Sequence, residues 1–213
     1  MIVNIRGTSG SGKSYLVRAV MDRYFSREAI HVEGRKQPLC YRLKRQDGGR
    51  DLWVIGHYEG ACGGADTVKT IDQTYHLVRN GHAGDLDVIY EGLVAQNNVT
   101  KCIELHQEGF PLLVVALNTS LEDCQKSIQA RRDAKGDDRQ MHRVVTPEMR
   151  ANLTAQDRRF LDAGIPYGML NTAKSHDTVL RLQVPRLRAA GVDCRVLDRA
   201  AALAAVLAAL GLR

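Results

Sequence analysis

Short apolar runs alternate along this chain with longer stretches in which apolar residues recur every three or four positions. The apolar runs have the length of buried β-strands and cover residues 1–5, 52–55, 87–92, 112–117, 192–197 and, as a further candidate, 165–170. The longer stretches predict helices over residues 13–25, 67–79, 96–108, 121–132, 147–163, 176–190 and 200–210. Strands that alternate with helices in this way are typical of a three-layer α/β fold around a central parallel sheet.

Residues 38–56 follow a different pattern, with a period of two. Alternate residues from Leu39 to Leu43 are apolar, whereas Arg42 and Lys44 face the other side. A glycine-rich turn signal divides the segment, so we expect a β-hairpin with a basic outer face. This face either binds a polyanion or protects the edge of the sheet from aggregation, and the pattern leaves both readings open.

The composition is that of one ordinary domain. The chain has 213 residues, 44% of them hydrophobic and 25% charged, and no repeat or linker divides it, so we expect a single domain over residues 1–213. Its five cysteines lack C-x-x-C spacing, which favours a reducing compartment over a zinc site or disulfide framework. The alanine-rich tail is too short to span a membrane, and a strand that begins at Met1 leaves no room for a signal peptide. We therefore expect a cytoplasmic protein without a membrane segment.

The formal net charge of +6 is concentrated in one part of the chain. Residues 1–50 carry eleven Lys and Arg against four Asp and Glu, whereas the rest carries nineteen against twenty. A concentrated basic surface is typical of a protein with a polyanionic partner, although a solvated basic face has the same composition. If the excess binds nucleic acid, the candidate contacts are Arg35, Lys36, Arg42 and Lys44.

Residues 7–14 match the phosphate-binding loop G-x-x-x-x-G-K-[ST], and they lie between a predicted strand and a predicted helix. Small residues in such a loop let backbone N–H groups converge on phosphates, and the helix directs its positive end toward them. The lysine reaches the β- and γ-phosphates, and the following hydroxyl binds Mg²⁺. We therefore predict ATP and Mg²⁺ as cofactors, bound by Gly7, Thr8, Ser9, Gly10, Ser11, Gly12, Lys13 and Ser14.

Acidic residues follow two further strands, and the carboxyl ends of parallel strands meet at one edge of a sheet. Glu91 ends a strand, so we expect it to hold Mg²⁺ directly or through water. Asp85 and Asp87 precede that strand and, at about 3.3 Å per residue, lie roughly 13 Å or more from Glu91. Glu59 is the first candidate for a general base toward an alcohol acceptor, and Asp66 is the second. Structural roles in holding backbone N–H groups stay open for these carboxylates.

The segment from about residue 131 to 146 is highly charged and nearly free of apolar residues, which predicts a mobile lid. Arg131 and Arg132 precede the loop, and Arg139 and Arg143 lie within it. Phosphoryl transfer spreads negative charge over three oxygens, and arginines on a closing lid would stabilise that charge. A solvated loop with compensating acids is the alternative.

Several segments resemble the bacteriophage P-loop kinases that phosphorylate 5-hydroxymethyluracil in DNA, which are related to nucleoside and nucleotide kinases. The matching segments lie within roughly residues 1–165 and are Asn4-Ile5-Arg6-Gly7 through Ser14, Glu33-Gly34-Arg35-Lys36-Gln37-Pro38, Gly56-His57-Tyr58-Glu59, Cys62-Gly63-Gly64-Ala65-Asp66-Thr67, Tyr90-Glu91-Gly92 and Arg131-Arg132. The resemblance implies ATP-dependent phosphorylation of a hydroxymethyl group on a base in duplex DNA, in the host cytoplasm if the chain is phage-encoded. Such a base has to leave the helical stack to reach the γ-phosphate.

Three functions are therefore compatible with the residues. The first is a kinase of hydroxymethyluracil in DNA, with Lys13, Glu59 or Asp66, Arg131 and Arg132 in catalysis and with DNA and ATP as partners. The second is a kinase of a free nucleoside or nucleoside monophosphate, which would use the same site with a smaller acceptor pocket. The third is a P-loop ATPase without a phosphoryl acceptor.

Overall fold

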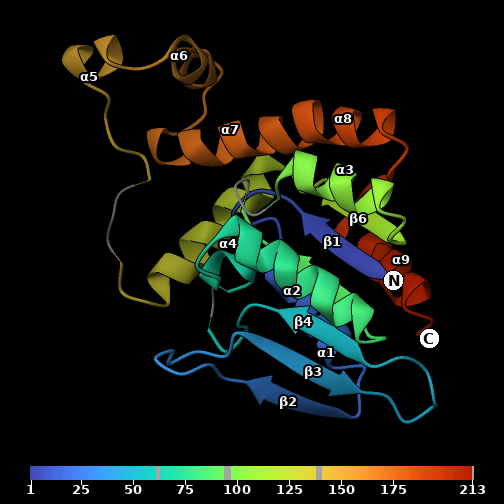
Figure 1. Cartoon of the computed structure of the whole chain (residues 1–213). Helices are drawn as coiled ribbons and strands as arrows, with labels where there is room; N and C mark the ends of the chain where they lie inside the picture. The colour runs from blue at the N-terminus through green and yellow to red at the C-terminus, as the bar shows by residue number, and fades with distance from the viewer. Residues whose placement is uncertain (61–62, 94–96, 138–140, 213) are drawn as a thin grey trace.

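A mixed β-sheet forms the centre of the computed structural model, which describes residues 1–60, 63–93, 97–137 and 141–212 (Figure 1). The strands of these residues are β1 Ile2–Arg6, β2 Ser26–Ile30, β3 Cys40–Lys44, β4 Leu52–Ile55, β5 Asp87–Glu91, β6 Leu112–Leu117 and β7 Asp193–Leu197. Their order in the sheet is β2-β3-β4-β5-β1-β6-β7. The strands from β4 to β7 in this order are parallel, whereas β2 and β3 are antiparallel to their neighbours.

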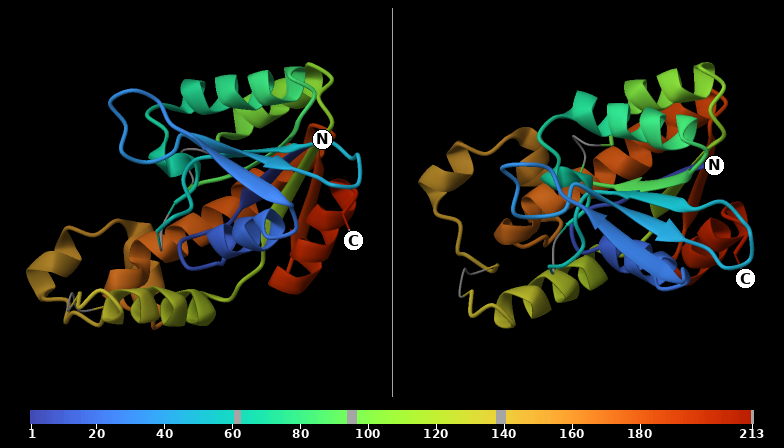
Figure 2. Two further views of the ribbon diagram at one scale, coloured as in Figure 1. Left: turned by 90° about the horizontal axis from the view of Figure 1, so that it is seen from below. Right: turned by 60° about the horizontal axis from the view of Figure 1, so that its bottom comes forward.

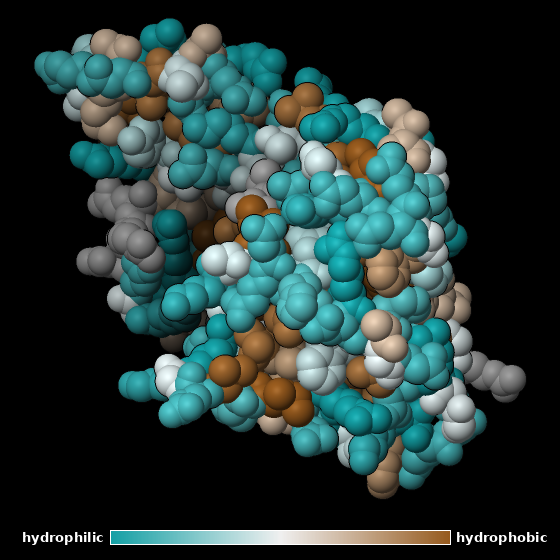
Figure 3. Space-filling view, viewed as in Figure 1, coloured by the Kyte–Doolittle hydropathy of each residue, from teal (hydrophilic) through white to brown (hydrophobic). Residues whose placement is uncertain are grey.

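Helices cover both faces of the sheet (Figure 2). They are α1 Lys13–Met21, α2 Ile71–Ala83, α3 Val99–Gln107, α4 Leu121–Asp133, α5 Pro147–Ala151, α6 Ala155–Asp162, α7 Leu170–Asp177, α8 Val184–Ala189 and α9 Arg199–Ala209, with a π-helical segment at Thr178–Gln183 between α7 and α8. One face of the sheet packs against α2, α3 and α8, and the other packs against α1 and α9. The helices α5 and α6 form an arm that stands away from the sheet (Figure 1). The surface on the α2 and α3 side is mostly hydrophilic (Figure 3).

The middle strands place the functional residues at one end of the sheet. Strands β1, β5 and β6 are buried along their whole length, as expected of parallel strands covered by helices on both faces. Because β1, β4 and β5 are parallel, their carboxyl ends meet, and the segments that follow them lie close together. We call this end of the sheet the carboxyl edge. None of the helices in the described part of the chain is long and apolar enough to span a membrane.

The N-terminal part of the chain differs from the sequence prediction in the bounds of two helices and by one strand. The helix predicted over residues 13–25 ends at Met21, and Phe25 beyond it is 70% exposed. The sequence does not predict β2, because its residues are nearly all exposed and show no apolar alternation. This strand pairs outside β3, so β2 rather than the predicted hairpin forms the edge of the sheet. The next helix spans Ile71–Ala83 rather than residues 67–79, and it starts at Ile71 because Thr70 caps its first turn.

The C-terminal part differs in its helices. The single helix predicted over residues 147–163 is two helices, because Thr154 and Asp157 form a capping box that starts α6. The strand predicted over residues 165–170 is wrong, since a 3₁₀ turn occupies Tyr167–Met169 and α7 follows at once. The helix predicted from residue 176 therefore begins at Leu170.

Candidate active site

The glycine-rich loop, residues 7–14, connects β1 to α1 at the carboxyl edge. Gly10 and Gly12 adopt left-handed φ values of 81° and 102°, and a Cβ at Gly10 would lie 2.5 Å from the Cys124 carbonyl oxygen. Position 10 therefore requires glycine, because any side chain would clash with the Cys124 backbone. Lys13 Nζ donates to the Thr8 carbonyl oxygen at 3.0 Å. The lysine is thus held against its own loop by a neutral oxygen.

Ser14 and Glu91 meet beside this loop. The Ser14 hydroxyl donates to Glu91 Oε1 at 2.6 Å, which joins the first turn of α1 to the end of β5. A Cβ at Gly64 would lie 2.5 Å from the same carboxylate oxygen, so this glycine makes room for the pair. Burial raises the pKa of Glu91, while the positive charge of Lys13 and the Ser14 hydrogen bond oppose the rise. The arrangement places two oxygen ligands suited to a hard cation next to a buried lysine.

A cavity of about 450 Å³ opens in front of these residues. Its described lining combines small loop residues, charged side chains and two larger apolar ones. The lining residues are Ser9, Gly10, Gly12, Lys13, Ser14, Tyr15, Arg18, Gly63, Asp66, Glu91, Leu93, Ser127, Arg131 and Arg199. The glycine-rich loop therefore faces a space that is large enough for phosphates and an acceptor group.

The two candidate bases lie in different surroundings. Both carboxylate oxygens of Asp66, which lines the cavity, accept from the Leu93 N–H at 2.8 Å. Burial of this carboxyl raises the pKa of Asp66, opposed by the Leu93 N–H and by the charge of Lys13. Glu59 is exposed, accepts from the Tyr41 hydroxyl at 2.7 Å, and is absent from the described cavity lining. The structure brings Asp66, and not Glu59, together with Lys13 and Glu91.

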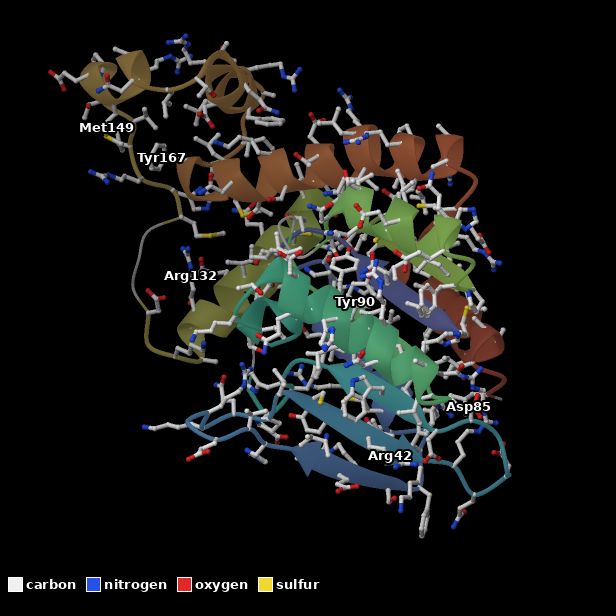
Figure 4. All side chains as sticks on the ribbon, in the orientation of Figure 1. Arg42, Asp85, Tyr90, Arg132, Met149 and Tyr167 are labelled. Atoms are coloured by element: carbon white, nitrogen blue, oxygen red, sulfur yellow. The ribbon has the colours of Figure 1, made fainter. Side chains whose placement is uncertain are left out.

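The predicted lid arginines lie at the end of α4. Arg131 lines the cavity, and its Nη2 lies 3.4 Å from Ser9 Oγ. Arg132 is half-buried on the same turn and lies at the end of the helix in Figure 4. The segment predicted as a lid includes Arg139, which lies outside the described residues, as does Cys62 of the glycine-rich segment after β4. A lid motion therefore stays a prediction.

Two arginines that the sequence analysis does not identify also line the cavity and donate to backbone carbonyl oxygens around it. Arg199, at the start of α9, donates through Nε to the Ser11 carbonyl oxygen at 2.9 Å. Arg18 donates to the Tyr58 carbonyl oxygen at 3.1 Å and to the Gly60 carbonyl oxygen. Arg18 lies one helical turn after Ser14, and Arg199 directly follows the loop after β7. The rule that ligands gather after the carboxyl ends of strands, applied to this last strand, would have indicated Arg199.

The four basic residues predicted to contact nucleic acid are not in one place. Lys36 lies in the β2–β3 loop at the carboxyl edge, where Arg35 Nη1 donates to the Thr67 carbonyl oxygen at 2.7 Å. Arg42 lies on β3, exposed and ion-paired with Asp51 at 3.1 Å (Figure 4). Lys44 ends β3 opposite Ser26, at the other end of the sheet. Arg35 and Lys36 are thus nearer to the cavity end of the sheet than Lys44.

The α/β sheet, the glycine-rich loop and the charged cavity are typical of nucleotide-binding proteins, a class that includes both kinases and ATPases. Comparison with known proteins gives the family. The chain is 46% identical over 166 residues to the 5-hmdU DNA kinase of Pseudomonas phage PaMx11, a match that covers 78% of this chain and 87% of that protein. The chain belongs to the family of phage 5-hmdU DNA kinases.

A second phage kinase is similar to the chain at lower identity. The chain is 27% identical over 180 residues to the 5-hmdU DNA kinase of Delftia phage PhiW-14, a match that covers 77% of this chain but 65% of that longer protein. No protein-family profile and no solved structure matches the chain.

Proposed function

We propose that this chain is a P-loop kinase that transfers the γ-phosphate of ATP to the hydroxymethyl oxygen of 5-hydroxymethyluracil in DNA. The observation that carries the proposal is the cavity in which Lys13, Ser14 and Glu91 meet the carboxylate of Asp66. The first three suit a nucleotide with its cation, and the fourth suits an alcohol acceptor. The relative at 46% identity, named as a 5-hmdU DNA kinase, supports this choice of acceptor.

The nucleotide would lie against the glycine-rich loop. Lys13 would exchange the Thr8 carbonyl oxygen for the β- and γ-phosphates, because a charged partner is stronger than a neutral one. Ser14 Oγ and Glu91 fit Mg²⁺, which takes hard oxygen ligands and completes its shell with phosphates and water. Among the described residues, no group of three or more His, Cys, Asp or Glu side chains is placed to hold a metal ion. Bound Mg²⁺ would neutralise charge that develops on the phosphates.

Asp66 is the carboxylate that we assign to the acceptor. It accepts the proton of the hydroxymethyl group while that oxygen forms a bond to the γ-phosphorus. The bond from this phosphorus to the β–γ bridging oxygen breaks, and ADP leaves with the bridging oxygen. The raised pKa of Asp66 brings it toward the operating pH, which favours proton transfer. Arg131, and Arg132 beside it, would stabilise the charge on the transferred group.

Labelling of three acceptors tests the function. The wild-type protein is incubated with γ-labelled ATP and with DNA containing hydroxymethyluracil, the same DNA containing thymine, or free hydroxymethyl-deoxyuridine and its monophosphate. We expect label in the modified DNA alone. Label in the free nucleoside or nucleotide would replace the proposal by a nucleotide kinase, and release of phosphate without any labelled acceptor would replace it by an ATPase.

A further inference from the structure

An exposed aromatic ring lies at the mouth of the cavity. Tyr15, in the first turn of α1, is 69% exposed, and Leu93, which also lines the cavity, is 44% exposed. They are the only large apolar side chains among the described lining residues, whose other members are small, polar or charged. The site thus combines a charged floor with two apolar groups at its opening.

Contacts of the neighbouring residues place Tyr15 on one side of the glycine-rich loop. On α1, Ser14 just before it binds Glu91 of β5, and Arg18 three residues later binds the segment after β4. Leu93 donates its N–H to Asp66. Tyr15 and Leu93 therefore border the β4–β5 side, the side of the carboxylate assigned to the acceptor.

The other side of the loop carries different chemistry. Arg199 donates to the carbonyl oxygens of Ser11 and Gly10, and Arg131 Nη2 lies near Ser9. These guanidinium groups come from α9 and α4, which follow β7 and β6. The cavity therefore has one side with two guanidinium groups, which suits the nucleotide. On its other side an exposed aromatic ring, suited to a flat group, lies near Arg18, whose guanidinium donates to the Tyr58 and Gly60 carbonyl oxygens.

A base that leaves a DNA duplex loses its stacking neighbours and needs a replacement surface. Side chains on a helix lean toward its N-terminus, which directs the Tyr15 ring toward the phosphate end of the cavity. We propose that Tyr15, together with Leu93, forms the platform on which the acceptor base stacks, with its hydroxymethyl group toward Asp66. This inference rests on the proposed function and identifies the residue that sets affinity for the base.

Substitution of the ring tests the platform, with KM measured separately for hydroxymethyluracil DNA and for ATP. Tyr15→Ala should raise the KM for DNA about 5- to 150-fold, the range that stacking on one aromatic ring supplies, with little change in the KM for ATP. Tyr15→Phe keeps the ring face and should stay close to wild type. Phe25→Ala is the matched control, because Phe25 is 70% exposed but lies outside the described cavity lining, and it should change neither constant.

Each other outcome overturns the inference in a distinguishable way. A higher KM for ATP with an unchanged KM for DNA would assign the ring to the nucleotide. Equal losses in Tyr15→Phe and Tyr15→Ala would show that the hydroxyl matters and the ring face does not. Unchanged constants in Tyr15→Ala, with normal transfer by the wild type, would refute the platform alone. Absence of transfer to modified DNA by the wild type would refute the proposed function and the platform with it.

Discussion

Two groups of side chains lie near the carboxyl end of β1, each around one cation, and only one of them faces the cavity. The Lys13 cluster consists of Lys13, Ser14, Glu91 and Asp66, and the Arg6 cluster consists of Arg6, Asn4, Asn97, Cys102 and Gln183. Lys13 faces the cavity beside Glu91 and Asp66, and its ammonium group is held by a backbone carbonyl oxygen. Arg6, the last residue of β1, has no exposed surface and is not among the described residues that line the cavity. Its guanidinium donates to Asn4 Oδ1 at 2.7 Å, to the Asn97 carbonyl oxygen at 2.6 Å, to Gln183 Oε1 at 2.7 Å and to Cys102 Sγ at 2.8 Å.

The difference separates binding from stability. The Arg6 cluster is closed, because its donors end on buried acceptors from β1, from α3 and the Asn97 segment before it, and from the π-helical segment. The Tyr90 hydroxyl lies 3.4 Å from one of these acceptors, Cys102 Sγ. The Lys13 cluster is open, and burial raises the pKa of both its acids, so in the absence of a ligand its charged state is costly. Charges that face a cavity in this way are typical of a functional site. Substitutions in the open cluster should therefore change activity without lowering stability, and those in the closed cluster should lower stability.

The largest expected effect is that of Lys13→Ala on phosphoryl transfer. Lys13 neutralises charge on the phosphates, a contribution similar in kind to that of an arginine finger, so the rate should fall about 10³- to 10⁵-fold. The midpoint of denaturant unfolding should change little, because the lysine donates to a loop carbonyl rather than to the core. A folded variant that retains the wild-type rate would remove Lys13 from the site.

Asp66→Asn should lower the rate of transfer to hydroxymethyluracil DNA about 10²- to 10⁴-fold, as expected for loss of a general base. Glu59→Gln is the matched control, since Glu59 lies outside the described cavity lining, and it should stay near the wild-type rate. Measurement of kcat for both variants distinguishes the two carboxylates. The reverse result, with Glu59→Gln the slower enzyme, would restore Glu59 as the base.

Arg6→Met should lower the free energy of unfolding by at least about 1–3 kcal/mol, the cost of one unsatisfied buried group, because it leaves several buried neutral acceptors without a donor. Arg199 is an exposed residue, so Arg199→Met should lower the free energy of unfolding by less than about 1 kcal/mol. Denaturant titration of the two variants measures both changes. Equal losses would mean that the closed cluster contributes no more than a surface contact.

Glu91→Gln should change stability and metal dependence in opposite directions. The folded-state pKa of Glu91 is raised, so the folded protein holds the proton more tightly than the unfolded chain, and stability falls as pH rises through the raised pKa. Glutamine removes this charge, and the variant should therefore be the more stable protein at neutral pH while its Mg²⁺ requirement weakens. Unfolding curves at several pH values, with Mg²⁺ titrations of the transfer rate, test both statements. If the stability of the wild type and that of Glu91→Gln changed equally with pH, the raised pKa of Glu91 would be contradicted.

The smallest expected effect separates two exposed lysines. Lys36 lies at the carboxyl edge and Lys44 at the opposite end of β3. If DNA crosses the cavity, Lys36→Ala should reduce the slope of log affinity against log salt by about 0.9, and Lys44→Ala should leave it nearly unchanged. Equal reductions would instead favour a DNA path along the whole basic hairpin.

The sequence predicts the open cluster far better than the closed one. Lys13 and Ser14 belong to a contiguous motif whose spacing is itself the signal, and Glu91 follows from the rule for strand ends. The sequence ranks Glu59 above Asp66 because Glu59 comes sooner after the end of a strand, whereas the described cavity lining includes Asp66 and not Glu59. Arg6 and Gln183 are 177 positions apart, so no local pattern could pair them. The edge strand β2 lacks an apolar signal altogether.

Stabilisation by a bound nucleotide tests the contrast between the clusters most directly. The free energy of unfolding is measured with and without the Mg²⁺ complex of a non-hydrolysable ATP analogue, at about 100 times the wild-type Kd. The wild type should gain about 2.7 kcal/mol, and Arg6→Met should gain the same increment from its lower starting point. Lys13→Ala should lose most of the increment. No gain in the wild type, or an equal gain in Lys13→Ala, would contradict the account.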